Sequence, residues 1–150
     1  MIAQSIQRLH FLCETIPQLL NEIDDHIFSL KPAAHQWSKK EIIGHLIDSA
    51  IANHQRFVRA QFEDTPKITY DQNNCNTFNY YNQIDSNQVI SFWTVYNKQL
   101  LELIRLIPQE LLMRRCFAGG DESVTLAFIF NDYVQHLEHH LKQVVSYQYL

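Results

Sequence analysis

Four long stretches of the chain carry apolar side chains at every third or fourth position, the spacing of one face of an α-helix. They run from Ile2 to about Leu30, from Ser38 to about Asp64, from Asp85 to Pro108 and from Ser123 to about Tyr147. With only 3 Gly and 4 Pro in 150 residues, few positions can interrupt a helix. The pattern predicts an all-α fold in one domain, residues 1–150, large enough to bury its own core.

Local signals place several helix ends within this pattern. Ser38 and Glu41 have the spacing of a capping box, in which the serine oxygen and the glutamate carboxylate accept from each other's backbone amides. Pro17 lies inside the first stretch, where it removes one backbone donor and clashes with the preceding turn. We therefore expect a secure start for the second helix and a kink or break near Thr15 in the first.

Residues 67–84 differ from the rest of the chain, because amide side chains alternate there with tyrosine and phenylalanine. This composition disfavours a regular helix and predicts a long loop with at most a short helical turn. Such a loop either covers one end of the protein as a lid or is a surface connection held by aromatic anchors. The resulting architecture is an up-down-up-down four-helix bundle with a long connection between its second and third helices.

Composition argues against several classes of function. The chain has 12 Lys and Arg against 16 Asp and Glu, a net charge of -4, and no extended basic patch for nucleic acid. No apolar run has the length of a membrane span and the first residues lack the features of a signal peptide, so we expect a cytoplasmic protein that binds no membrane. Cys13, Cys75 and Cys116 form no Cys-x-x-Cys pair and are expected to be inert thiols.

Histidines supply the most specific chemical signal. His136 and His140 are four residues apart, so on a helix both imidazoles lie on one face and can point at one ion. His45, in the second helical stretch, is the best third ligand if the two helices face each other. His54 lies on the opposite side of that helix, and His139 is offset to the flank of its own.

Three further side chains are candidates for catalysis near these histidines. Asp48 lies one turn from His45 and would orient an imidazole or act as a base, or else is a solvated carboxylate. Tyr133 and Gln143 flank the other two histidines along the same helix face. A metal with an open position would act as a Lewis acid and lower the pKa of a bound thiol or water. The alternative for the three histidines is a hydrogen-bonded cluster in the core.

The segment Trp37-Ser38-Lys39-Lys40-Glu41-Ile42-Ile43-Gly44-His45-Leu46-Ile47-Asp48-Ser49, together with His136-x-x-x-His140 ahead of Gln143, resembles the DinB-like family. These are DNA-damage-inducible four-helix proteins, distinct from the DNA polymerase of similar name. The resemblance covers nearly the whole chain. It implies a divalent metal, nickel or zinc, held by His45, His136 and His140, and a homodimeric protein.

The resemblance also implies a range of activities. Some relatives are thiol S-transferases that use a low-molecular-weight thiol as co-substrate, others resemble metal-dependent hydrolases or isomerases, and many have no known reaction; a small-molecule substrate is implied. The first function is therefore a metal-dependent enzyme of thiol transfer or hydrolysis. The alternative is a non-catalytic, stress-related helical binding or scaffold protein with a vestigial metal site. The sequence leaves the choice between them open.

Overall fold

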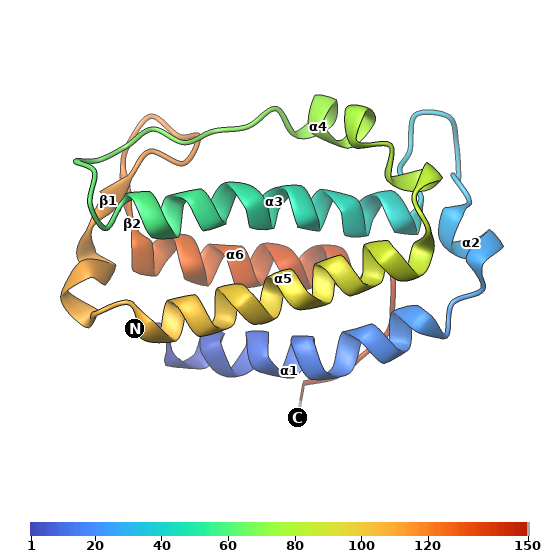
Figure 1. Cartoon of the computed structure of the whole chain (residues 1–150), viewed down its shortest axis with the longest axis horizontal. Helices are drawn as coiled ribbons and strands as arrows, with labels where there is room; N and C mark the ends of the chain where they lie inside the picture. The colour runs from blue at the N-terminus through green and yellow to red at the C-terminus, as the bar shows by residue number, and fades with distance from the viewer. Residues whose placement is uncertain (150) are drawn as a thin grey trace.

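The computed structural model describes residues 1–149 and shows four long helices packed side by side (Figure 1). The bundle helices are α1 (Ala3–Asn21), α3 (Lys39–Arg59), α5 (Ser86–Leu106) and α6 (Leu126–Leu141). Shorter elements connect them: α2 (Asp25–Ser29), α4 (Gln72–Asn79), η1 (Tyr81–Gln83), η2 (Gln109–Met113) and the antiparallel strands β1 (Arg115–Cys116) and β2 (Val124–Thr125). The all-α four-helix bundle is confirmed, and the small hairpin β1–β2 is an addition that the helical pattern did not predict.

The directions of the helices differ from the alternating order that we expected. The starts of α3 and α5 lie together, since Ser38 Oγ donates to Asn82 Oδ1 at 2.6 Å. The starts of α1 and α6 also meet, through a hydrogen bond of 3.2 Å from Asn131 Nδ2 to the Met1 carbonyl. The order is therefore up-down-down-up, with α3 and α5 parallel (Figure 1).

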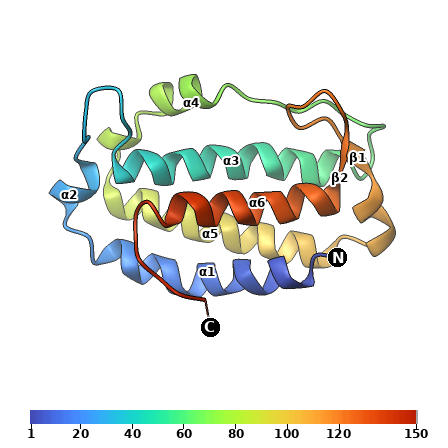
Figure 2. The same cartoon turned by 180° about the vertical axis from the view of Figure 1, so that it is seen from behind.

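A long connection makes the parallel arrangement possible. The 21 residues of α3 span about 31 Å, and the chain after α3 must return over that length before α5 begins. Residues 60–85 do so along the outer side of α3, with α4 lying beside it in both views (Figure 2). The long connection that we predicted is present, but it covers the side of α3 and not an end of the bundle. Its aromatic anchor is Tyr81, which is buried.

Helix ends agree in part with the local signals. The capping box of Ser38 and Glu41 is present, with both hydrogen bonds at 3.0 Å. The expected break near Thr15 is wrong, because α1 continues through Pro17 and ends only at Asn21. Burial of apolar side chains on this part of the helix outweighs the one backbone hydrogen bond that proline removes. The last helix ends at Leu141, earlier than the expected end near Tyr147.

Apolar side chains from the four long helices and from α2 fill the interior. The largest fully buried ones are Trp93, Phe28, Phe57, Phe130, Leu9, Leu12, Ile16, Leu20, Ile43, Leu46, Ile47 and Leu100. Tyr133 is buried with them, and its hydroxyl donates to Asn97 Oδ1 at 2.5 Å, which ties α6 to α5. Within residues 1–149, no helix combines the length and apolar character needed to cross a membrane.

Gly44 is the position at which the connection presses most closely on α3. A Cβ atom there would lie 2.1 Å from Cδ2 of Tyr81. We expect Gly44→Ala to lower the free energy of unfolding by about 1–3 kcal/mol, because overpacking outweighs the gain in helix propensity. Urea unfolding followed by circular dichroism measures this. Gly120→Ala is the control, since the nearest atom to its Cβ is 3.9 Å away, and equal stability of both variants would contradict the close packing.

Candidate metal centre

Three imidazoles meet where α3 and α6 pack against each other. His45 comes from α3, and His136 and His140 come from adjacent turns of α6. One nitrogen from each ring can be chosen such that all three lie within 4.8 Å of one another. The Nε2 atoms of His45 and His136 are 3.2 Å apart. The structure therefore brings together the three histidines that the sequence singled out.

The other two histidines considered lie outside this group. His54 is on another side of α3, where its Nδ1 is 2.8 Å from the hydroxyl of Tyr96 on α5. His139 is exposed on the flank of α6, with its ring stacked edge-on against that of His140. Both positions follow from helical geometry, since residues nine or one apart do not share a face.

Burial favours the neutral form of His45 and His136. Desolvation, together with charge repulsion from His136 and His140, lowers the pKa of His45 to about 3. Burial also lowers the pKa of His136 to about 4, helped by His140. His45 is fully buried, with the indole of Trp37 against its ring at 4.9 Å between centroids. Neutral imidazoles carry the free lone pair that a metal needs.

Two of the three donor atoms have the spacing of ligands on a first-row divalent metal. Two imidazole nitrogens bound at about 2.0–2.1 Å with a tetrahedral angle lie about 3.3 Å apart. The separation of 3.2 Å between the Nε2 atoms of His45 and His136 matches that value. A hydrogen bond would also explain this distance, but it would leave the nearby nitrogen of His140 without a role. A three-nitrogen set also leaves room for water or substrate at the ion.

Gln143 is placed to orient one of these rings. Its Oε1 lies 3.0 Å from Nδ1 of His140, so the amide oxygen accepts from Nδ1–H. The proton is thereby held on Nδ1 and the lone pair on Nε2 is free, which is the usual role of a group behind a metal ligand. Tyr133, in contrast, directs its hydroxyl away to Asn97, and burial raises its pKa well above the usual value.

Asp48 is buried, so the interpretation of this residue as a solvated surface carboxylate is wrong. Its Oδ1 accepts from the Tyr81 hydroxyl at 2.6 Å and from Asn79 Nδ2 at 2.9 Å, while Oδ2 is buried without a partner. Burial raises the pKa of this carboxyl, and the bond from Tyr81 opposes the rise. Asp48 has no hydrogen bond to His45, whose Nδ1 is also buried without a partner. It anchors the connection to α3.

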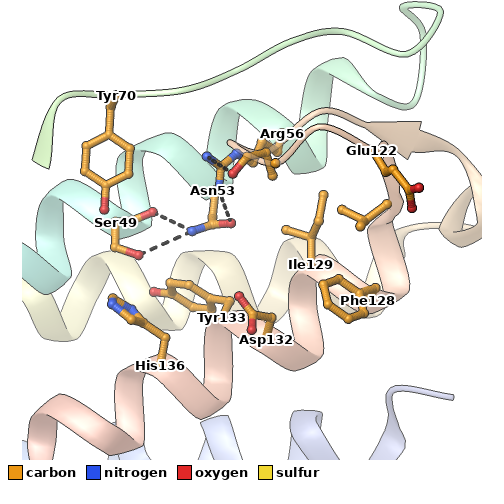
Figure 3. A pocket seen from close by; sticks show the side chains of 13 residues that line it. Ser49, Asn53, Arg56, Tyr70, Glu122, Phe128, Ile129, Asp132, Tyr133 and His136 are labelled. Carbon is orange, nitrogen blue, oxygen red and sulfur yellow. Dashed lines mark hydrogen bonds between the residues drawn. The ribbon is translucent and has the colours of Figure 1, made fainter.

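A pocket of about 340 Å³ opens beside His136 (Figure 3). It lies between α3 and α6 and is bordered by the connection and the loop of the hairpin. Its lining residues are Ser49, Asn53, Arg56, Tyr70, Ala118, Gly120, Glu122, Val124, Phe128, Ile129, Asp132, Tyr133 and His136. The structure thus offers a small molecule a place next to the grouped imidazoles.

Sequence reasoning missed the polar wall of this pocket. Ser49, Asn53 and Arg56 follow His45 at intervals of four, four and three residues, so they continue its face along α3. That spacing was a usable signal. The contribution of Tyr70 had no comparable signal, because it depends on the path of an irregular segment.

The low pKa values of the two histidines predict a pH-dependent stability of the metal-free protein. Unfolded imidazoles titrate near 6.5, whereas His45 and His136 titrate at about 3 and 4 when folded, so the unfolded chain binds more protons between these values. Stability therefore falls as pH drops, by about 1–2 kcal/mol per histidine between pH 7 and pH 5, allowing for partial exposure of His136.

Urea unfolding in the presence of a chelator at both pH values measures this loss. His45→Gln should reduce the pH dependence, whereas His10→Gln, at an exposed position, should leave it unchanged. An equal dependence in all three proteins would show that these imidazoles are not held neutral by the fold.

Comparison with known proteins places the chain among structures of the same architecture. YfiT from Bacillus subtilis, named a probable metal-dependent hydrolase with an unusual four-helix bundle topology, superposes with a TM-score of 0.84 at 21% identity. The match covers 94% of this chain and 82% of YfiT. The DinB-like protein YjoA from Bacillus subtilis gives a TM-score of 0.64 at 16% identity, over 94% of this chain and 86% of YjoA.

A mycothiol-dependent maleylpyruvate isomerase has a TM-score of 0.80 at 10% identity. The match covers 97% of this chain but only 61% of the isomerase, which has further structure. No curated protein matches the chain. The sequence profile of the DinB superfamily matches residues 8–144, most of the chain, including all three grouped histidines. The protein belongs to the DinB superfamily.

Proposed function

We propose that this protein binds one divalent metal ion through His45, His136 and His140 and uses it to activate a small molecule. The observation that carries the proposal is the convergence of three imidazole nitrogens within 4.8 Å of one another beside an open pocket. Zinc and nickel are the candidate ions, since imidazole ligands suit both. The solved structures that share this fold include proteins named as metal-dependent and thiol-dependent enzymes, which supports the same chemistry here.

The metal supplies Lewis acidity, which lowers the pKa of a thiol or water bound to it. Side chains of the protein orient the histidine ligands and shape their surroundings. Gln143 fixes the orientation of His140 through their 3.0 Å hydrogen bond, and Trp37 covers one side of His45. The ring of Tyr133 forms an apolar wall of the pocket close to His136, which limits access of water to a bound substrate.

Two carboxylates line the pocket, those of Glu122 and Asp132. Asp132 is the one closer in sequence to the grouped histidines. It lies one turn before His136 on α6, is exposed, and lines the same cavity (Figure 3). In this position it serves as a proton acceptor for a thiol or water entering the pocket. Asp48 does not share this cavity, so we assign it the structural role described above and not catalysis.

Thiol transfer and hydrolysis both require a nucleophile deprotonated near neutral pH, and the proposed centre provides for either. We favour transfer with a low-molecular-weight thiol, because a pocket of about 340 Å³ with both polar and apolar walls has room for an organic co-substrate as well as for water. The alternative is a non-catalytic, stress-related binding or scaffold protein with a vestigial metal site, which would bind a small molecule in this pocket without activating it.

Metal content tests the centre directly. Protein purified without a metal-affinity tag should contain about one equivalent of zinc or nickel per chain, because three imidazoles form one site. His45→Ala and His136→Ala should lose the metal while remaining helical by circular dichroism, and His139→Ala is the matched control that should retain it. A parent protein that takes up neither ion when supplied in excess would eliminate the enzyme and leave a helical binding protein.

Binding of a thiol separates thiol chemistry from hydrolysis. Addition of 2-mercaptoethanol to nickel- or cobalt-loaded protein should produce a thiolate-to-metal charge-transfer band, since soft thiolates bind such ions directly. The band should be absent from metal-loaded protein treated with ethanol. A metal-loaded protein that shows no band with any small thiol would favour hydrolysis.

A further inference from the structure

Arg56 is a buried cation in the wall of the pocket beside His136. Its side chain lies near the end of α3 and is 8% exposed. Buried guanidinium groups are normally paired with a carboxylate, because removing a charge from water is costly. The contacts of Arg56 do not follow that rule.

The acceptors around Arg56 are all neutral. Its Nε and Nη2 donate to the Ile68 carbonyl at 3.0 and 2.9 Å, Nη1 donates to Asn53 Oδ1 at 3.2 Å, and Nη2 donates weakly to the Ala118 carbonyl at 3.5 Å. Among residues 1–149, no carboxylate forms a hydrogen bond or ion pair with it. A guanidinium has five N–H groups, so one on Nη1 is left for a ligand.

The pocket also contains two carboxylates, and neither forms an ion pair with Arg56; the charge of Asp132 acts on the guanidinium only from a distance. Glu122 and Asp132 are exposed side chains, whose charges are screened by water. Figure 3 shows Glu122 on the hairpin loop, turned away from Arg56. The positive charge of Arg56 is therefore held in place by neutral oxygens, and no carboxylate of the described residues contacts it.

Helical geometry sets the distance between this charge and the three imidazoles. Arg56 follows His45 by eleven residues on α3, about 16 Å along the helix axis. The bond to Asn53 shows that the guanidinium points back along the helix toward His45, which shortens the gap. Ser49 and Asn53 line the pocket between Arg56 and His136 (Figure 3). A ligand that contacts both ends must therefore be extended.

We propose that the pocket binds an elongated small molecule with a carboxylate at Arg56 and its reactive end at the three histidines. This inference rests on the proposed metal centre and adds the charge and shape of the substrate. Arg56 is then a positioning residue that fixes the distance between the carboxylate and the ion.

The test uses metal-loaded protein and two thiols of equal length, 6-mercaptohexanoate and 6-mercaptohexanol, followed by the charge-transfer band. The carboxylate should bind at least about tenfold more tightly, the effect of one charge-assisted hydrogen bond. Arg56→Gln should abolish that preference. Arg59→Gln should keep it, because Arg59 lies on the same helix but pairs with Glu63. The shorter 3-mercaptopropionate should show a smaller advantage over 3-mercaptopropanol.

Equal affinities of the two six-carbon thiols in the parent protein would overturn the proposal without any variant. Because the two thiols are compared in the parent protein, the result does not depend on whether a substitution of Arg56 disturbs the fold. Arg56→Lys, which keeps the charge, should retain part of the preference. If no band appears with either thiol, thiol binding at the metal fails by itself, and calorimetry of both thiols with metal-free protein then decides whether the carboxylate binds at Arg56. No difference in that calorimetry would overturn the carboxylate site.

Discussion

The antiparallel contact between α3 and α6 is the constraint on which the rest of this structure depends (Figure 2). It places His45, which is fully buried, opposite His136 and His140, which are partly exposed. The same contact forms one wall of the pocket from α3 and the other from α6. Apolar packing elsewhere in the bundle fixes this contact, so a polar site is held by a rigid frame and not by loops.

The long connection is held to α3 by polar contacts as well as apolar ones. Asp48 receives hydrogen bonds from Tyr81 and Asn79, and Arg56 binds the carbonyl of Ile68. Buried polar groups that lack such partners would be destabilising, so these contacts fix where the segment lies. They also close one side of the pocket. The path that allows α3 and α5 to run parallel thus contributes to the site.

Sequence periodicity was sufficient to predict the helices, the cap at Ser38 and the histidine group, because each depends on residues close in sequence or on one face of a helix. It was insufficient for helix direction, since a connection as long as residues 60–85 allows either a parallel or an antiparallel return. The role of Arg56 was out of reach for a related reason. Its acceptors at Ile68 and Ala118 belong to irregular segments whose paths no local pattern specifies.

The arrangement of the imidazoles argues against a purely structural role. A neutral imidazole has one donor and one acceptor, and three rings whose nitrogens converge bring lone pairs toward one another. One proton shared between His45 and His136 removes the repulsion between their two lone pairs only. One metal cation would accept the lone pairs of all three nitrogens at once. The unpartnered Nδ1 of His45 adds to the cost of keeping that ring buried. Leucine at this position would pack without that cost, so the histidines are better explained by what they bind than by the stability they provide.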